Sequence, residues 1–200
     1  MPSNRLRLLS GGTKDLIPKA QILSKPEIDR AITRIAHEIL ERNRGPHDLM
    51  LLGLLRGGEW LAEALAIKIE ALEGVSIPHG VLDTSNFRDD YPRQDDDVLE
   101  LTLDRTVMPV SPKDRVVILV DDVFFTGRTV RAALDSLLSR ARASKVQLAV
   151  MVDRGHREVP IRPDYVGKNL PTSLNEYVEV TPDMISIYQN DLPNGMENES

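Results

Sequence analysis

The run from Val116 to Val120 is made of β-branched and aliphatic residues with no polar residue between them. A strand with one face in water alternates apolar and polar residues, so an unbroken apolar run predicts a strand that is buried on both faces. Strands of this kind occur in parallel sheets that carry helices on either side. Because strand and helix patterns alternate through the middle of the chain, the sequence predicts one α/β domain.

The rest of the chain supplies the other elements of such a domain. A helix is predicted from Ser24 to about Asn43, where Ile28, Ile32, Ile35 and Ile39 recur at helical spacing. Further helices are expected at 59–72 and 129–142, and further strands at 48–52, 75–83, 98–103, 146–152, near 165, at 177–180 and at 185–188. Residues 1–24 are interpreted as a loosely ordered N-terminal extension, 25–190 as the single domain and 191–200 as a C-terminal tail.

The composition, 41% hydrophobic and 28% charged, is that of a globular protein. The longest apolar run, 49–55, contains a glycine and is far shorter than the ~20 residues that a membrane helix needs. The chain has no cysteine and no apolar segment typical of a secretory signal. We therefore expect a cytoplasmic protein without a membrane partner.

Two acids and a short turn follow the buried strand, in the order Asp121, Asp122, Val123, Phe124, Phe125, Thr126, Gly127, Arg128, Thr129. Ligands of parallel sheets bind where the strands end. There the threonine hydroxyls, a glycine that permits close approach and the unpaired N–H groups of the next helix suit a phosphate. Neighbouring carboxylates instead accept hydrogen bonds from vicinal hydroxyls. The segment therefore predicts a site for a phosphorylated sugar, although an ordinary strand, turn and helix with an acidic end is the alternative.

The same segment resembles the PRPP-binding motif of the type I phosphoribosyltransferases, whereas GxGxxG and GxxxxGK[ST] motifs are absent. The resemblance implies the fold of that family: a central, mostly parallel sheet flanked by helices, with a small hood and a flexible loop. It also implies that PRPP binds with Mg²⁺, held mainly through PRPP itself. We assign no catalytic base and no protein ligand of the metal.

Two other segments fit this resemblance. Arg56-Gly57-Gly58 lies between a predicted strand and a predicted helix, where backbone N–H groups can bind a second anion, here pyrophosphate. A Gly-Gly pair is also a simple way to make a tight turn. The segment departs from the Lys-Thr-Arg-Gly pattern of the relatives and is closer to the purine-salvage enzymes. Arg88, at the start of a polar segment that matches the flexible loop, is the expected anion contact there.

A more specific resemblance lies in the segment DRGHREVPIRPDYVGKN, residues 153–169. Together with residues 33–38 and 119–131, it resembles the bifunctional regulators of pyrimidine operons, a branch of the same family, from about Ser24 to Tyr188. The resemblance implies uracil phosphoribosyltransferase activity, which converts uracil and PRPP to UMP and pyrophosphate. It also implies attenuation of transcription through binding to pyrimidine-operon leader RNA, controlled by UMP or UTP, and a homodimer or higher homo-oligomer.

Residue roles follow from the same resemblance. The residues expected at the base are Val152, Asp153 and Arg154. The residues expected at the RNA are Thr33, His37, Arg157, Arg162 and Lys168. Two alternatives remain open: Glu158 and Asp164 could pair with Arg157 and Arg162 as weak surface salt bridges, and the chain could be a purine or orotate phosphoribosyltransferase without RNA regulation.

Overall fold

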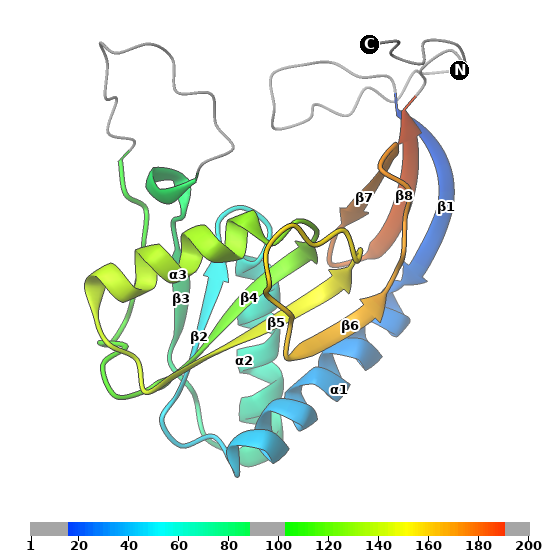
Figure 1. Cartoon of the computed structure of the whole chain (residues 1–200). Coiled ribbons are helices and arrows are strands. Elements are labelled where there is room, and N and C mark those ends of the chain that lie inside the picture. Colours follow the sequence, from blue (N-terminus) through cyan, green and yellow to red (C-terminus); the bar gives the residue numbers. More distant parts are fainter. Residues whose placement is uncertain (1–15, 89–102, 191–200) are drawn as a thin grey trace, which may run out of the picture.

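The computed structural model describes residues 16–88 and 103–190, and its center is a five-stranded parallel sheet (Figure 1). The strand order is β3 (His79–Leu82), β2 (Leu49–Leu54), β4 (Val116–Phe124), β5 (Lys145–Asp153) and β6 (Tyr165–Asn169). All four neighbouring pairs are parallel. The predicted parallel sheet with alternating helices is therefore confirmed.

Both faces of the sheet are covered, as the apolar run in β4 predicted. Val117 and Leu119 of β4 pack in one apolar cluster with α3 (Arg128–Arg140). Ile118 and Val120 point to the opposite face and pack in a second cluster with α1 (Lys25–Asn43) and α2 (Glu59–Glu73). Successive residues of a strand face opposite sides, so a strand between two helical layers must be apolar at every position.

Helix α1 forms where its apolar spacing predicted it. Its isoleucines at positions 28, 32, 35 and 39 are all buried. At its start the Glu27 carboxylate accepts hydrogen bonds from the Ser24 backbone N–H, at 2.8 Å, and from the Ser24 hydroxyl, at 2.6 Å. This local cap fixes the first turn of the helix.

A second, antiparallel sheet lies beside the main one and has the order β1 (Leu16–Ser24), β8 (Met184–Asn190), β7 (Glu176–Val180). The expectation of a loosely ordered segment through residue 24 is therefore wrong for residues 16–24. These residues pair with β8, from Leu16 opposite Asn190 to Ser24 opposite Met184. The partner strand is at the other end of the chain, so no local pattern revealed the pairing. Residues 1–15 and 191–200 lie outside the described residues.

Other boundaries also differ from the sequence expectations. The strand expected at 116–121 continues through both acids to Phe124 as β4. Ser85–Phe87 forms a short 3₁₀ helix, η1. Most of the strand expected at 98–103 falls in 89–102, outside the described residues, and Leu103 is not in a strand. Among the helices that the structure describes, none has the length and apolar character needed to cross a membrane.

Candidate functional site

The two acids of β4 lie on opposite faces of the sheet near its carboxyl edge. Asp121 is buried and lines a cavity of about 330 Å³ on the α3 side. Asp122 is half-buried and faces the turn after β2, where a Cβ built on Gly57 would lie 2.6 Å from Asp122 Oδ2. The pair therefore lies between two turns, with one carboxylate toward each.

Burial changes the protonation of both acids. It raises the pKa of Asp121 well above its ordinary value, and the neighbouring charge of Asp122 raises it further, while Arg88 opposes the shift. Burial also raises the pKa of Asp122, to about 6. Removing carboxylates from water disfavours their charged form. Such groups are typical of a site that receives a ligand with hydroxyl groups or cations.

The turn at Phe125, Thr126 and Gly127 leads directly into α3 and forms the floor of the cavity. Gly127 has φ = 87°, a left-handed conformation that favours glycine, and a Cβ there would lie 2.6 Å from Val159 Cγ2. The Thr126 hydroxyl accepts a hydrogen bond from the Arg128 backbone N–H at 3.3 Å. The cavity is therefore at the N-terminus of a helix, where N–H groups and the helix dipole favour an anion.

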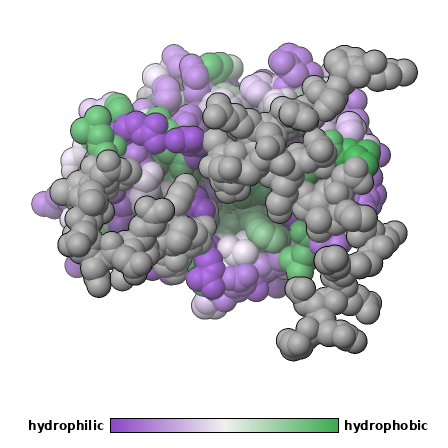
Figure 2. All heavy atoms as spheres, turned by 90° about the horizontal axis from the view of Figure 1, so that it is seen from above, coloured by the Kyte–Doolittle hydropathy of each residue, from purple (hydrophilic) through white to green (hydrophobic). Residues whose placement is uncertain are grey.

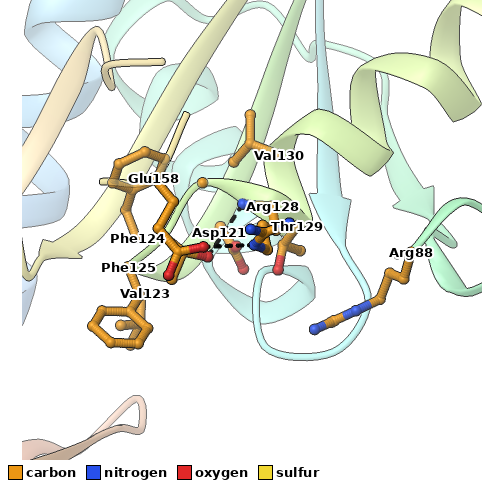
Figure 3. A pocket seen from close by; sticks show the side chains of 11 residues that line it. Arg88, Asp121, Val123, Phe124, Phe125, Arg128, Thr129, Val130 and Glu158 are labelled. Atoms are coloured by element: carbon orange, nitrogen blue, oxygen red, sulfur yellow. Dashed lines mark hydrogen bonds and ion pairs between the residues drawn. The ribbon is translucent and has the colours of Figure 1, made fainter. Parts of the chain in front are cut away.

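Charged side chains surround the cavity (Figure 3). Its lining includes Arg88 and Arg128, and Thr129 from the first turn of α3. It also includes Glu158, whose Oε2 accepts a hydrogen bond from Arg128 Nε at 2.6 Å. In Figure 3 the Arg88 side chain extends toward the cavity from the side opposite Glu158. The sequence interpretation had Arg88 and Arg128 in the site but had no place in it for Glu158.

The Arg56-Gly57-Gly58 turn lies at the end of β2, the strand paired with β4. Arg56 is exposed, the Leu55–Arg56 peptide bond is cis, and Gly57 has φ = 124°. The Gly57 N–H donates to Glu59 Oε2 at 2.6 Å. The structure thus brings this turn and the acid pair together at one edge, as expected. Figure 2 views the molecule from that side and shows a hollow with hydrophobic residues on its visible floor and hydrophilic residues along part of its edge.

The residues expected to contact the nucleobase lie at the end of β5, the strand next to β4. Val152 is fully buried in the core, and Asp153 accepts hydrogen bonds from the Gly155 N–H at 2.9 Å and from Arg157 Nη2 at 2.5 Å. Arg154 is only 7% exposed and stacks over the Phe125 ring at 4.2 Å.

The Arg154 guanidinium is held by the segment before β7. It donates to Thr172 Oγ1 at 2.8 Å, to the Glu176 carbonyl at 2.7 Å and to the Ser173 carbonyl at 3.3 Å. Its polar atoms therefore bind protein acceptors, and its stacking on Phe125 forms part of the wall at this edge. Recognition of the nucleobase by Arg154 stays a prediction. The hydrogen bond from Arg154 to Thr172 was not predicted, because no sequence motif marks Thr172.

The five residues expected at the RNA form two groups. On α1, Thr33 is half-buried and His37 is exposed, and Lys168 is exposed on β6, which packs along α1. Arg157 and Arg162 lie on the connection from β5 to β6. That connection crosses the α3 face, where the preceding Ile161 packs against the α3 cluster.

The alternative of local pairs with Glu158 and Asp164 is wrong. Arg157 instead pairs with Asp153, Asp164 pairs with Arg42 at 2.8 Å, and Glu158 pairs with Arg128. Each partner comes from another element or from the strand end, because the connection folds back on the sheet. Local spacing in the sequence could not show this.

A further residue that sequence reasoning missed is Tyr177 on β7. Burial raises its pKa, and the negative charge of Asp122 raises it further. Tyr177 of the small sheet is therefore near enough to Asp122 to interact with its charge, and no motif marks the residue.

Comparisons with known proteins agree with this geometry. The model of the phosphoribosyl transferase domain matches residues 19–183. Solved structures with the same fold include the hypoxanthine phosphoribosyltransferase of Trypanosoma cruzi, with a TM-score of 0.64 at 18% identity over 87% of this chain and 98% of that one. A hypoxanthine-guanine phosphoribosyltransferase from Bacillus anthracis gives a TM-score of 0.62 at 16% identity over 86% and 99%. At these identities the likeness concerns the fold alone.

Relatives in sequence are much more similar. The bifunctional protein PyrR of Deinococcus radiodurans is 55% identical over 82% of this chain and 87% of its own length. The bifunctional protein PyrR of Brevibacillus brevis is 48% identical over 87% of this chain and 99% of its own length. The chain therefore belongs to the PyrR family of phosphoribosyltransferases.

Proposed function

We propose that the protein is a uracil phosphoribosyltransferase that also regulates pyrimidine-operon transcription by binding leader RNA in response to UMP or UTP. Membership in the PyrR family supports both activities. The observation that carries the enzymatic part is the convergence of two anion-binding turns, after β2 and after β4, on either side of an acid pair.

PRPP has an anion at each end of its ribose, and the two turns fit this distribution. The 5′-phosphate takes the cavity at the start of α3, where it accepts hydrogen bonds from the backbone of residues 126–129 and from Arg128. The pyrophosphate lies at Arg56-Gly57, and the acid pair accepts hydrogen bonds from the ribose hydroxyls between them. Arg88 supplies a further cation beside the cavity.

Displacement at C1 of the ribose passes through a cation-like sugar, as in glycoside chemistry. In such a reaction the protein mainly orients the partners and neutralises the leaving pyrophosphate. Arg56 provides positive charge for that group, and the carboxylates of Asp121 and Asp122 stabilise positive charge on the sugar. The uracil would approach from the β5 edge, with the Phe125–Arg154 stack as its wall.

Mg²⁺ fits this arrangement as part of the substrate. The ion prefers oxygen ligands and usually keeps several waters and phosphate oxygens in its shell. No group of three or more His, Asp or Glu side chains suited to a metal occurs in residues 16–88 and 103–190. The acid pair offers oxygens beside the pyrophosphate turn, so Mg²⁺ would be held mainly by PRPP and at most by these carboxylates.

A panel of bases tests the enzymatic proposal and separates it from its alternative. The protein is incubated with PRPP and Mg²⁺ together with uracil, orotate or hypoxanthine, and nucleotide formation is followed by chromatography. We expect UMP from uracil and no product from the other two. Product from hypoxanthine or orotate alone would favour a purine or orotate phosphoribosyltransferase and contradict the proposal.

The RNA proposal is tested by titrating labelled leader RNA with and without UMP. We expect UMP to raise RNA affinity, and by linkage RNA should raise UMP affinity by the same factor. Arg162→Ala should lower RNA affinity and reduce the slope of log affinity against log salt by about 1. It should leave UMP formation unchanged, because Arg162 is exposed and does not line the phosphate cavity. RNA affinity that is indifferent to UMP would contradict the regulatory role.

We also propose a homodimer or higher homo-oligomer. Two large apolar side chains on helices, Ile67 of α2 and Leu138 of α3, are 60% and 57% exposed. Burying apolar area is the main favourable term in self-association. Light scattering coupled to size exclusion gives the mass directly, and a mass of 22.4 kDa at micromolar concentration would contradict this proposal.

A further inference from the structure

We propose that Glu158 competes with the ligand's 5′-phosphate for Arg128, and that its displacement transmits nucleotide binding to the segment that carries Arg157 and Arg162. This inference rests on the proposed function and names the regulation of the same site. It assigns a role to a carboxylate that the proposed chemistry does not use.

The position of Glu158 is unusual for an anion site. Its carboxylate lines the cavity at the start of α3 and bonds to Arg128 Nε at 2.6 Å (Figure 3). An anion in a phosphate pocket repels a phosphate, and a guanidinium binds phosphate strongly with a geometry that suits it. In the structure the Glu158 carboxylate is bound to the Arg128 guanidinium, the group that a phosphate would bind.

The pair is able to open. The side chains of Arg128 and Glu158 are 42% and 49% exposed, so both can be solvated when they separate. An exposed ion pair contributes little to stability, at most about 1 kcal/mol. A ligand phosphate that carries two charges therefore has enough interaction energy to replace the carboxylate.

Glu158 is also joined to the turn through its backbone. Its N–H donates to the Thr126 carbonyl at 2.9 Å, and the next residue, Val159, fills the space beside Gly127. A change in the turn at residues 125–127 would therefore directly displace residues 158 and 159.

The other side of this segment reaches the base edge. The Arg157 side chain bonds to the buried Asp153, and its guanidinium carbon lies 5.6 Å from the center of the Phe124 ring. Nε2 of His156 lies 2.5 Å from the Thr172 carbonyl oxygen. In this arrangement Arg157 is held against the sheet edge. Residues 156–159 thus connect the phosphate turn, the base edge and an arginine that is expected to bind RNA.

A ligand shifts an equilibrium between two arrangements only if it interacts differently with them. The Arg128–Glu158 bond belongs to the phosphate-free arrangement, so a phosphate at Arg128 favours the arrangement in which residues 156–159 are released. The 5′-phosphate is then a necessary part of the signal. UMP should act on the RNA-binding segment, whereas uridine should not.

The test compares the wild type with Glu158→Gln, which keeps the size of the side chain and removes its charge. Calorimetry with UMP should show about two- to fivefold tighter binding to the variant, the size expected from loss of one exposed charge interaction. Binding of uridine should be equal in both proteins. Glu63→Gln, a change at an exposed position on α2 away from the cavity, is the matched control and should behave as wild type.

The regulatory part is read from RNA affinity. Without UMP, Glu158→Gln should bind leader RNA more tightly than the wild type, and the factor by which UMP raises RNA affinity should be smaller. Glu158→Asp, whose shorter side chain keeps the charge but loses reach, should also weaken the dependence on UMP. Thermal unfolding and circular dichroism confirm that each variant is folded.

Two kinds of failure are distinguishable. A wild type that binds neither UMP nor leader RNA contradicts the proposed function itself. If the wild type responds to UMP but Glu158→Gln binds UMP no more tightly or keeps the full response, then Glu158 is not the competitor and this inference is wrong.

Discussion

At the scale of single residues, the site depends on two adjacent carboxylates that the sheet directs apart. Asp121 faces the phosphate cavity and Asp122 faces the Arg56-Gly57-Gly58 turn, since successive strand residues point to opposite faces. Both are ionised less readily than ordinary aspartates because burial removes them from water. The folded protein therefore carries an electrostatic cost at the place where we propose that PRPP binds, as is typical of functional sites.

This cost gives a prediction for Asp122→Asn. The pKa of Asp122 rises on folding from the ordinary 3.8 to about 6, so the folded state binds the proton more tightly than the unfolded state. The contribution of Asp122 to the free energy of unfolding should therefore be most favourable below pH 4. It should fall as the pH rises through 6. Removing the charge should therefore stabilise the protein at pH 7 to 8, on the order of 1–2 kcal/mol.

Urea unfolding from pH 4 to 8 measures this effect. The stability gain of Asp122→Asn should be largest above pH 6 and should disappear near pH 4, while kcat/KM for UMP formation should drop by about 10- to 100-fold because a charged hydrogen-bond acceptor is lost. Asp183→Asn changes an exposed carboxylate that pairs with Lys25 and serves as the control. A gain that does not depend on pH would contradict this account.

At the scale of elements, the turn proposed to bind pyrophosphate is packed against β4, the strand that carries the acid pair. The turn after β2 passes so close to β4 that a Cβ on Gly58 would lie 2.0 Å from the Val120 carbonyl oxygen and 2.7 Å from the Leu54 N. Both contacts are backbone atoms of buried strands, which cannot move aside independently. The spacing between the turn and the acid pair is therefore set by the packing of β2 on β4.

Gly58→Ala should disturb this packing. The backbone of Gly58, at φ −80° and ψ −14°, suits alanine, so the effect is steric and not conformational. We expect a loss of about 1–3 kcal/mol from overpacking, together with a higher KM for PRPP because the turn is displaced.

The matched change is Gly74→Ala, where no atom lies within 4 Å but φ is 68°. For Gly74→Ala we expect stability to fall by only roughly 1 kcal/mol, because alanine disfavours the left-handed conformation, and KM for PRPP to stay unchanged. Thermal unfolding and PRPP titration measure both variants. Equal KM values for the two variants would show that the β2 turn is not held by this contact.

At the scale of the whole molecule, a buried arginine links the two sheets at the edge where the site lies. Arg154 follows β5 of the main sheet, stacks on Phe125 and donates three hydrogen bonds to the segment 172–176, which leads into β7 of the small sheet. Arg154 therefore adds a polar link to the apolar packing that holds the small sheet on the main core.

Arg154→Met should keep much of the stacking volume and remove the three hydrogen bonds. We expect a loss of about 2–4 kcal/mol, since buried acceptors are left without partners. Hydrogen exchange followed by mass spectrometry should show faster exchange in β7 and β8 than in β4 and β5. Arg34→Met, which removes two hydrogen bonds to carbonyls of β6, should leave β7 and β8 unchanged. Uniform exchange throughout Arg154→Met would contradict a local link.

The sequence by itself determined the main sheet, its helices and the edge where the site lies. Apolar runs, helical spacing and turn residues act over a few neighbouring positions, so β4, α1 and α3 were predictable, as was the meeting of Arg56-Gly57-Gly58 with Asp121 and Asp122. The 153–169 segment carried the family resemblance in the same local way.

Only the tertiary structure decided the partners of individual side chains and the pairing of distant segments. It placed Leu16–Ser24 beside β8, extended β4 through Asp121 and Asp122, and brought Glu158 to Arg128 and Asp164 to Arg42. These contacts join residues through the crossing of strands and connections. Their energy depends on distances and burial that exist only after the chain has folded, so spacing along the sequence does not reveal them.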